Sequence, residues 1–216
     1  EWRNVAGYST ESVAQHTFAL LFYLLEKMRY YDEYVKSEKY VGDTTFTHFA
    51  NVFHEVAGKT WGIVGLGNIG RRVAEIAKLF GCRVIYYSTS GKNNNADYER
   101  VSFDEILAQS DILSVHAPLD ENTRGLFDKA AFEKMKSTSI FINVGRGPIV
   151  DERALADALT GGQIASAGLD VLSVEPMVES NPLRAIKDSE KLIITPHIAW
   201  ASVEARTRLM QIIAGQ

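Results

Sequence analysis

The stretch that decides the fold is Thr60-Trp61-Gly62-Ile63-Val64-Gly65-Leu66-Gly67-Asn68-Ile69-Gly70. It opens with a short apolar run of strand length, and residues 68–80 carry apolar side chains at the helical period. The stretch therefore predicts a β-strand, a glycine-rich turn and an α-helix in immediate succession. Gly81, directly after the helix, is a natural stop.

Each glycine of the turn has a mechanical role in this context. Gly65 permits a tight turn, Gly67 leaves room for a pyrophosphate to touch the backbone, and Gly70 lets the helix and strand pack closely. Asn68 and Ile69 begin the helix, where free N–H groups and the positive end of the helix dipole attract phosphate. We therefore expect a dinucleotide site; the alternative is a glycine-rich turn without a ligand.

Short apolar strands and helices alternate along the rest of the chain. Strands are expected at residues 60–65, 83–87, 111–115, 139–144, 164–169 and 191–195, and helices at 68–80, 102–109, 128–135, 151–160 and 202–213. Such alternation indicates βαβ crossovers. The expected fold class is therefore α/β, a doubly wound parallel sheet of the Rossmann type. Few helix breakers occur from Ser9 to Lys39, which predicts a long N-terminal helix, and residues 41–58 are expected to be an irregular crossover with at most a short helical turn.

The composition excludes several classes of protein. The 216 residues carry a formal net charge of −4 and a pI of about 5.8, without the basic footprint of a nucleic-acid-binding domain. The longest apolar run, Phe18 to Leu25, is far too short for a membrane span, and no signal peptide is visible. Cys82, the single cysteine, allows no intrachain disulfide and fits a cytoplasmic location. Since the chain starts at Glu1 rather than Met, we expect a piece of a longer protein.

The end of the second strand bears on the choice of cofactor. NAD enzymes usually place an acidic residue there, about 20 residues beyond the glycine turn, to bind the ribose 2′-hydroxyl. Ser88 stands at that place, and no Asp or Glu occurs from Arg83 to Ala96. Ser88 would not repel a 2′-phosphate, and Ser90, Lys92 or Arg83 could help to hold one. Both NAD and NADP remain open at this point.

Three polar side chains follow the fourth, fifth and sixth expected strands. They are Arg146, Glu175 and His197. Because ligands of open parallel sheets bind beyond the carboxyl ends of the strands, we expect all three at the same edge as the glycine turn. Taken singly, each is more often a surface charge or a structural histidine; their joint placement favours a catalytic site.

The sequence resembles the D-isomer-specific 2-hydroxyacid dehydrogenases, in particular the glycerate dehydrogenase and hydroxypyruvate reductase branch. The resemblance covers nearly the whole chain. The matching segments, in order, are Ser12-Val13-Ala14-Gln15, Gly65 to Gly70, His116-Ala117-Pro118-Leu119 with Thr123, Asn143-Val144-Gly145-Arg146-Gly147, Gly168-Leu169-Asp170-Val171, Glu175-Pro176 and Thr195-Pro196-His197-Ile198.

The resemblance implies an NAD- or NADP-dependent oxidoreductase. Hydride would move between the nicotinamide and C2 of a D-2-hydroxy acid or 2-oxo acid such as glycerate, hydroxypyruvate or glyoxylate. His197 would be the acid/base, Glu175 its partner, and Arg146 the grip on the oxo acid. The residues implied to line the cofactor groove are His116, Pro118, Thr123, Val144 and Asp170, with Asp170 beside the nicotinamide carboxamide.

The family's organisation predicts three regions in this chain. Residues 1–58 hold the long helix and a dimerisation loop of the cofactor domain, residues 59–200 the dinucleotide-binding domain, and residues 201–216 a C-terminal helix. A separate substrate domain is absent, so we expect the chain to bind dinucleotide but to turn over poorly. A homodimer is expected, because the run Phe18 to Leu25 is apolar on all sides and must be buried.

Other interpretations are weaker. A dinucleotide-sensing corepressor of the same fold would need a partner motif, which the sequence does not show. A formate dehydrogenase pairs its histidine with Gln, whereas Glu175 stands here; phosphoglycerate and phosphite dehydrogenases remain near alternatives. His16, His48 and His54 are expected only to pack, and no cluster has metal-ligand spacing.

Overall fold

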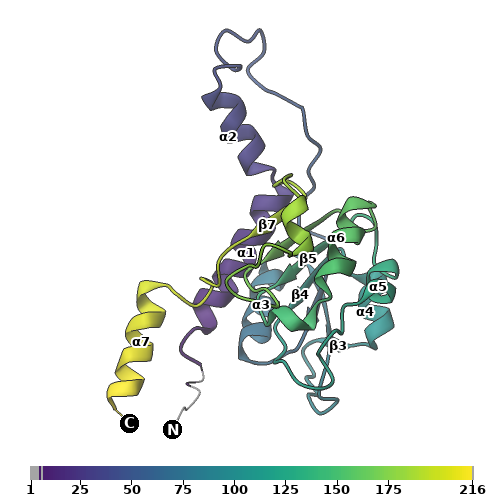
Figure 1. The fold of residues 1–216 in the computed structure, drawn as a ribbon, viewed down its shortest axis with the longest axis vertical. Helices are drawn as coiled ribbons and strands as arrows, with labels where there is room; N and C mark the ends of the chain where they lie inside the picture. Colours follow the sequence, from purple (N-terminus) through teal and green to yellow (C-terminus); the bar gives the residue numbers. More distant parts are fainter. Residues whose placement is uncertain (1–4, 6, 216) are drawn as a thin grey trace.

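The computed structural model describes residue 5 and residues 7–215; the outermost parts of the ranges expected above, residues 1–4, 6 and 216, lie outside the described residues. Seven parallel strands form one sheet in the order β3-β2-β1-β4-β5-β6-β7 (Figure 1). They are β1 (Thr60–Val64), β2 (Arg83–Tyr87), β3 (Glu99–Arg100), β4 (Ile112–Val115), β5 (Ile140–Asn143), β6 (Ser166–Leu169) and β7 (Leu192–Ile194). The order reverses between β1 and β4, which confirms the doubly wound α/β fold.

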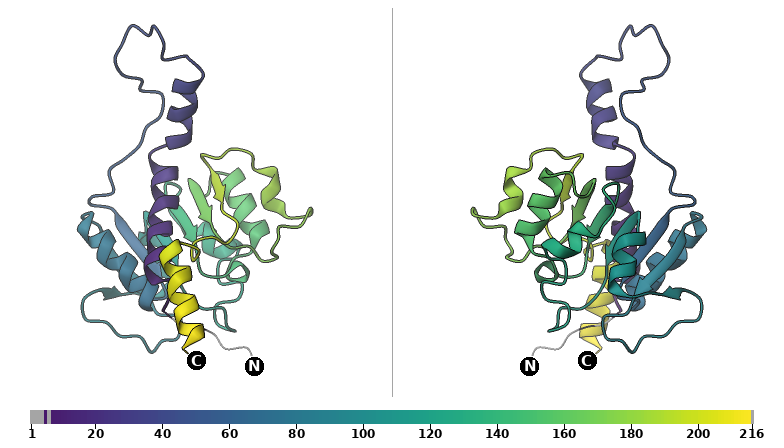
Figure 2. Two further views of the ribbon diagram at one scale, coloured as in Figure 1. Left: turned by 90° about the vertical axis from the view of Figure 1, so that its left-hand side faces the viewer. Right: turned by 90° about the vertical axis from the view of Figure 1, so that its right-hand side faces the viewer.

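Helices cover both faces of the sheet (Figure 2). The helices of the described residues are α1 (Thr10–Leu25), α2 (Met28–Lys36), α3 (Asn68–Leu79), α4 (Phe103–Gln109), α5 (Lys129–Glu133), α6 (Glu152–Thr160) and α7 (Val203–Ala214). Of these, α1, α3, α4, α5 and α6 pack on the sheet. Two short 3-10 turns, η1 (Gly147–Ile149) and η2 (Pro182–Ala185), complete the elements. The core of one face is built from α1 and α3 around Trp61, and that of the other from α4, α5 and α6 around Phe127 and Phe141.

Capping side chains fix where the helices begin. Ser102 and Glu105 form the capping box at the start of α4: the Glu105 amide donates to Ser102 Oγ at 3.3 Å, and the Ser102 amide donates to Glu105 Oε2 at 2.8 Å. Asp128 and Asp151 cap α5 and α6. These three helix starts agree with the sequence analysis.

Two elements differ from the expectation. The long N-terminal helix is present as α1, but it ends at Leu25 because Lys27 adopts a left-handed conformation with φ 53°, and α2 starts afresh at Met28. The expected single helix to Lys39 is therefore wrong. The sheet also has a seventh strand, β3, which pairs with β2 at its outer edge.

An arm made of α2 and residues 37–58 projects away from the sheet (Figures 1 and 2). Its loop contains no helix among the described residues, and it exposes Phe46 and Phe49 at 92% and 90%. Aromatic rings pack within the arm, where His48 stacks on Tyr34 with ring centroids 3.8 Å apart.

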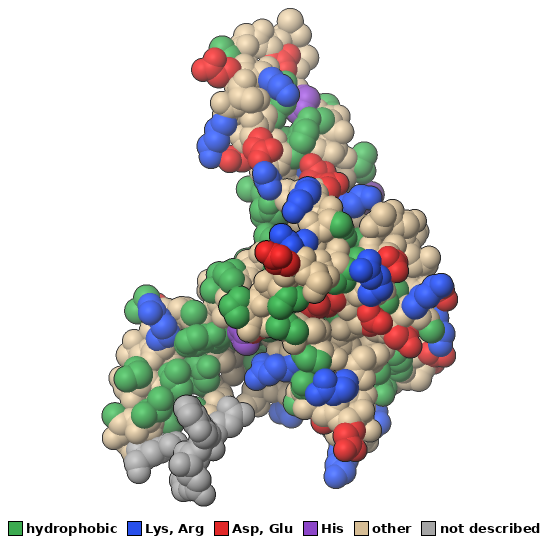
Figure 3. All heavy atoms as spheres, in the orientation of Figure 1, with side chains coloured by type: hydrophobic (Ala, Val, Ile, Leu, Met, Phe, Trp, Pro, Cys, Tyr) green, Lys and Arg blue, Asp and Glu red, His purple; other side chains and the backbone are tan. Residues whose placement is uncertain are grey.

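The C-terminal helix α7 lies to one side of the sheet (Figure 1). Only Ala205 of this helix is buried, while Val203, Met210 and Ile213 are exposed. Hydrophobic side chains gather over α7 at the lower left of Figure 3. No helix in the described part of the chain is long and apolar enough to cross a membrane.

Candidate active site

The glycine-rich turn joins β1 to α3. Gly65 has φ +91°, and a Cβ there would lie 2.8 Å from the backbone of Ala117; a Cβ on Gly70 would lie 2.2 Å from the carbonyl oxygen of Gly65. The fold itself therefore requires glycine at both positions. At Gly67 a Cβ would meet nothing within 4 Å, so the fold leaves that position open.

The start of α3 faces the same open space. Gly67 is its N-cap and supplies no side-chain cap to the first turn, which begins with the exposed Asn68 and the half-buried Ile69. The N–H groups of that turn and the positive end of the helix dipole are available to an anion. The open backbone and these donors fit the pyrophosphate of a dinucleotide.

The loop after β2 is tied to the glycine turn. Ser88 is 4% exposed, and its Oγ accepts the Asn93 amide at 3.2 Å. The Asn93 side chain donates to the carbonyl oxygen of Leu66 at 2.5 Å. Arg100 reaches this loop from β3, with Nη2 4.0 Å from the place of a Cβ on Gly91. The loop after β2 thus has the basic Arg100 beside Gly91.

His116 follows β4 at the same edge. Its Nε2 lies 2.9 Å from Ser114 Oγ, and the same oxygen accepts the Trp61 ring N–H at 2.8 Å. The Nδ1 of His116 is buried and has no hydrogen-bond partner among the described residues. Burial lowers the pKa of His116 to about 3, so the ring is neutral.

The other residues expected to line the cofactor groove differ in their exposure to solvent. Pro118 is exposed, whereas Thr123 is buried: its hydroxyl donates to the Pro118 carbonyl at 2.7 Å and accepts the Asp120 amide at 2.8 Å. Thr123 therefore braces the loop after β4 from inside. Val144, 7% exposed, follows β5.

Arg146, Glu175 and His197 follow β5, β6 and β7, at the carboxyl edge where β1 also delivers the glycine turn. His197 Nδ1 lies 2.7 Å from Glu175 Oε2. The exposed Arg146 is held by its own neighbourhood: its Nη1 donates to the Gly145 carbonyl at 2.8 Å, and the Asn143 side chain donates to the Arg146 carbonyl at 3.0 Å. The structure thus joins Glu175 to His197 and leaves the guanidinium at the same edge.

The electrostatics favour an ionised Glu175. Partial burial of its carboxyl raises the pKa, but hydrogen bonds from His197 and the Leu172 amide, with the charges of His197 and Arg146, outweigh burial and bring the pKa below its ordinary value. The Leu172 amide donates to Oε1 at 2.7 Å, which leaves Oε2 for the imidazole. A carboxylate only accepts, so His197 carries a proton on Nδ1.

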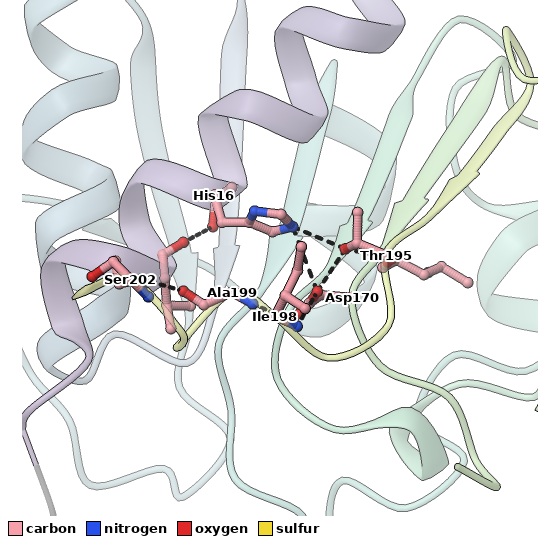
Figure 4. Close-up of polar contacts among 10 residues, drawn as sticks. His16, Asp170, Thr195, Ile198, Ala199 and Ser202 are labelled. Atoms are coloured by element: carbon pink, nitrogen blue, oxygen red, sulfur yellow. Dashed lines mark hydrogen bonds and ion pairs between the residues drawn. The ribbon is translucent and has the colours of Figure 1, made fainter. Parts of the chain in front are cut away.

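The Asp170 side chain is buried and hydrogen-bonded within the protein. It is 1% exposed, and its carboxylate accepts the Thr195 hydroxyl at 2.5 Å, the Ile198 amide at 2.9 Å and the Ala199 amide at 2.8 Å (Figure 4). Its side chain is therefore bonded to the segment that carries His197.

A hollow of about 490 Å³ lies beside these groups. Its lining residues are Asp170, Leu172, Glu175, Pro176, Met177, Ile194, Thr195, Pro196 and His197. The catalytic candidates Glu175 and His197 thus face a space large enough for a small organic acid.

Sequence reasoning missed two groups at this edge. His16, expected only to pack, extends from α1 to Thr195, with Nε2 2.9 Å from Oγ1. Asn93 was part of a run of three asparagines with no distinguishing pattern. Both contacts join segments remote in sequence, so no local signal could have found them.

A parallel sheet in this order, a glycine turn at its first strand and a histidine–carboxylate pair at the same edge define a dinucleotide-binding domain of an oxidoreductase. The chain belongs to the D-isomer specific 2-hydroxyacid dehydrogenases: residues 18–199 match the profile of the family's NAD binding domain.

Known proteins agree with this assignment. A hydroxypyruvate reductase of Blautia hydrogenotrophica is 38% identical over 213 residues, which cover 97% of this chain and 65% of the relative. A solved acyclic imino acid reductase in complex with NADPH and D-Arg has a TM-score of 0.84 at 33% identity and covers 96% of this chain and 64% of that one. D-Lactate dehydrogenase of Aquifex aeolicus, complexed with NAD and lactic acid, has a TM-score of 0.86 at 28% identity, with 98% and 66% covered. The chain therefore spans just under two thirds of the length of these proteins.

Proposed function

We propose that this chain is the cofactor-binding part of an NAD(P)-dependent 2-hydroxyacid dehydrogenase that interconverts a D-2-hydroxy acid and its 2-oxo acid. Glycerate with hydroxypyruvate, or glyoxylate, is the proposed substrate class; relatives carry the names hydroxypyruvate reductase, glyoxylate reductase and glycerate dehydrogenase. The observation that carries the proposal is the 2.7 Å pair of His197 and Glu175, at the edge where the glycine turn lies.

The proposed chemistry divides between two groups of residues. The bound nicotinamide supplies or accepts the hydride. His197 exchanges the proton of the substrate oxygen through Nε2, because its Nδ1 is engaged by Glu175. The Glu175 carboxylate stabilises the imidazolium form that must donate during reduction. Arg146 offers a permanent fork of donors to the carboxylate and carbonyl of a 2-oxo acid.

Gly65, Gly67, Asn68, Ile69 and Gly70 are the proposed pyrophosphate cradle. The other proposed cofactor contacts are Ser88, His116, Pro118, Thr123, Val144 and Asp170. The unpartnered Nδ1 of His116 supports this assignment, because a buried polar atom at a ligand groove gains from a hydrogen-bond partner on the ligand.

The adenosine end of the cofactor remains a choice between NAD and NADP. Structures similar to this chain hold NAD in one case and NADPH in another. A buried serine in place of an acid, with Lys92 and Arg100 on or near the loop after β2, supports acceptance of a 2′-phosphate. Calorimetric titration of the chain with NADH and with NADPH decides between them.

A substrate domain outside residues 1–216 is part of the proposal, with residues 1–58, 59–200 and 201–216 as the regions of the cofactor part. The exposed apolar face of α7 supports it, since Val203, Met210 and Ile213 need a partner surface. We expect the chain alone to bind dinucleotide without efficient turnover. Robust steady-state reduction of hydroxypyruvate or glyoxylate by the 216-residue chain would contradict this division.

A homodimer through the arm and a cytoplasmic location are also proposed. The exposed Phe46 and Phe49 of the arm support the dimer, because isolated aromatic side chains on a projecting loop gain by burial against a second copy. Light scattering of the chain and of a Phe49→Asp variant tests it; a monomer mass for the unmodified chain excludes the dimer. A single free cysteine supports the cytoplasmic location: Cys82 is buried, and burial raises the pKa of its thiol to about 11.

The activity itself is tested in the full-length protein. Oxidation of NADH or NADPH with hydroxypyruvate should be lost on His197→Asn, while the dinucleotide affinity of the variant chain stays unchanged. Dinucleotide binding without any 2-oxo acid reduction in the full-length protein would favour the corepressor-like alternative.

A further inference from the structure

The backbone at His197 adopts a conformation that its own sequence does not favour. His197 has φ 55°, in the left-handed region that L side chains rarely enter. Its neighbours are Pro196 and Ile198, and neither residue makes a left-handed conformation at His197 more favourable. Such a turn persists only where its surroundings hold it. The position of the imidazole therefore depends on the groups that bond the backbone on either side.

Asp170 provides most of that support. The His197 amide donates to the Asp170 carbonyl at 2.9 Å, the Ile198 amide to Oδ1 at 2.9 Å, and the Ala199 amide to Oδ2 at 2.8 Å. Three successive amides of the turn thus end on one residue, which is 1% exposed (Figure 4). The orientation of the Asp170 carboxylate consequently sets the turn.

Thr195 and His16 fix that carboxylate from its other side. Thr195 Oγ1 lies 2.5 Å from Asp170 Oδ1, and because a carboxylate only accepts, the threonine proton points to Asp170. The lone pairs of Thr195 Oγ1 then accept from His16 Nε2, 2.9 Å away. Nε2 of His16 is also 3.5 Å from Asp170 Oδ1. The bonding order is therefore His16 to Thr195 to Asp170, with the His16 proton on Nε2.

The helix α1, which carries His16, forms a second set of hydrogen bonds with the segment that follows His197. Ser12, one helical turn before His16, donates from Oγ to the Ala199 carbonyl at 2.6 Å. The Ser202 amide donates to Ser12 Oγ at 3.4 Å. Since α1 packs against the sheet through its buried face, it is a rigid frame for the turn.

We propose that His16 and Thr195 are positioning residues that hold the His197 turn through Asp170 and so keep the imidazole on Glu175. The functional meaning rests on the proposed function, in which His197 is the acid/base. Neither side chain forms a hydrogen bond or ion pair with Glu175 or the His197 ring in the described part of the chain; their effect passes through the Asp170 carboxylate.

The test is amide hydrogen exchange by NMR on the 216-residue chain. Thr195→Val and His16→Met remove the donors at nearly constant volume, and should speed exchange of the Ile198 and Ala199 amides at least tenfold relative to Leu113 in β4. Thr195→Ser and His16→Gln restore a hydroxyl and an N–H donor, and should return the rates to within threefold of the unmodified chain. The ring N–H signal of His197, bonded to Glu175, should weaken in the first pair and recover in the second.

Thr17→Val is the matched control. Thr17 is a buried threonine of α1 whose hydroxyl donates to Val13 within the helix, so its loss should leave the Ile198 and Ala199 rates unchanged. If His16→Met exchanges like the unmodified chain, or if His16→Gln is as fast as His16→Met, the proposal is wrong. The His16 pair decides the matter even where Thr195→Val does not fold. Neither readout needs turnover, so a failed dehydrogenase assay would refute the proposed function and leave this result standing.

Discussion

The variant Gly67→Ala should leave the free energy of unfolding nearly unchanged but weaken dinucleotide binding. At this position φ is −81°, which alanine adopts readily, and its Cβ would meet no atom within 4 Å. Alanine gains about 0.4–1 kcal/mol from the smaller entropy of the unfolded chain. Loss of glycine at an N-cap costs a similar amount. The free energy of unfolding should therefore change by less than about 1 kcal/mol.

Dinucleotide affinity should respond differently. A methyl group placed in a close contact costs about 1–3 kcal/mol, or roughly a 5- to 150-fold rise in Kd. Calorimetric titration with NADH and NADPH measures the effect, and urea unfolding measures stability. Gly161→Ala, at the end of α6 with φ −77°, is a control remote from the turn. If Gly67→Ala binds both cofactors as tightly as the unmodified chain, the pyrophosphate does not lie against Gly67 and the proposed cradle is wrong.

Three further outcomes follow from the site. Glu175→Gln keeps the geometry but removes the charge beside His197, so kcat of the full-length protein should fall at least tenfold in a steady-state assay, with dinucleotide affinity unchanged. The folded-state pKa of His116 is about 3 against an ordinary 6.5, so the unfolded chain binds the proton first and stability is lost as pH falls below about 6.5. At 1.36 kcal/mol per pKa unit the loss from pH 7 to pH 5 is about 2 kcal/mol, and urea unfolding should show a shallower pH dependence for His116→Gln. Removing Lys92 and Arg100 together should weaken NADPH at least fivefold in calorimetry and leave NADH within twofold; equal loss for both cofactors would place neither side chain at a 2′-phosphate.

The sequence predicts the sheet because each central strand is a short apolar run, and because β1, β4 and β5 are each followed by a helix whose start the sequence marks. It does not predict β3, since Glu99 and Arg100 are exposed charged residues with no apolar alternation, held only by pairing with β2. The break of the N-terminal helix after Leu25 could not be predicted from the sequence either. Glu26 and Lys27 are good helix formers, so the left-handed turn at Lys27 reflects where the arm leaves the sheet and not local propensity.

The same distinction explains which parts of the site were predictable. Glycine, arginine and histidine at strand ends carry their chemistry in their identity and in their place along the chain. The support of His197 does not, because His16 and Asp170 are joined only after α1 has packed against the sheet. His197, the proposed acid/base, has φ 55°, a conformation that its own short segment does not favour and that the surrounding structure must hold. Its geometry is instead a tertiary property, which is why a helix with no candidate function of its own should influence the position of the proposed acid/base.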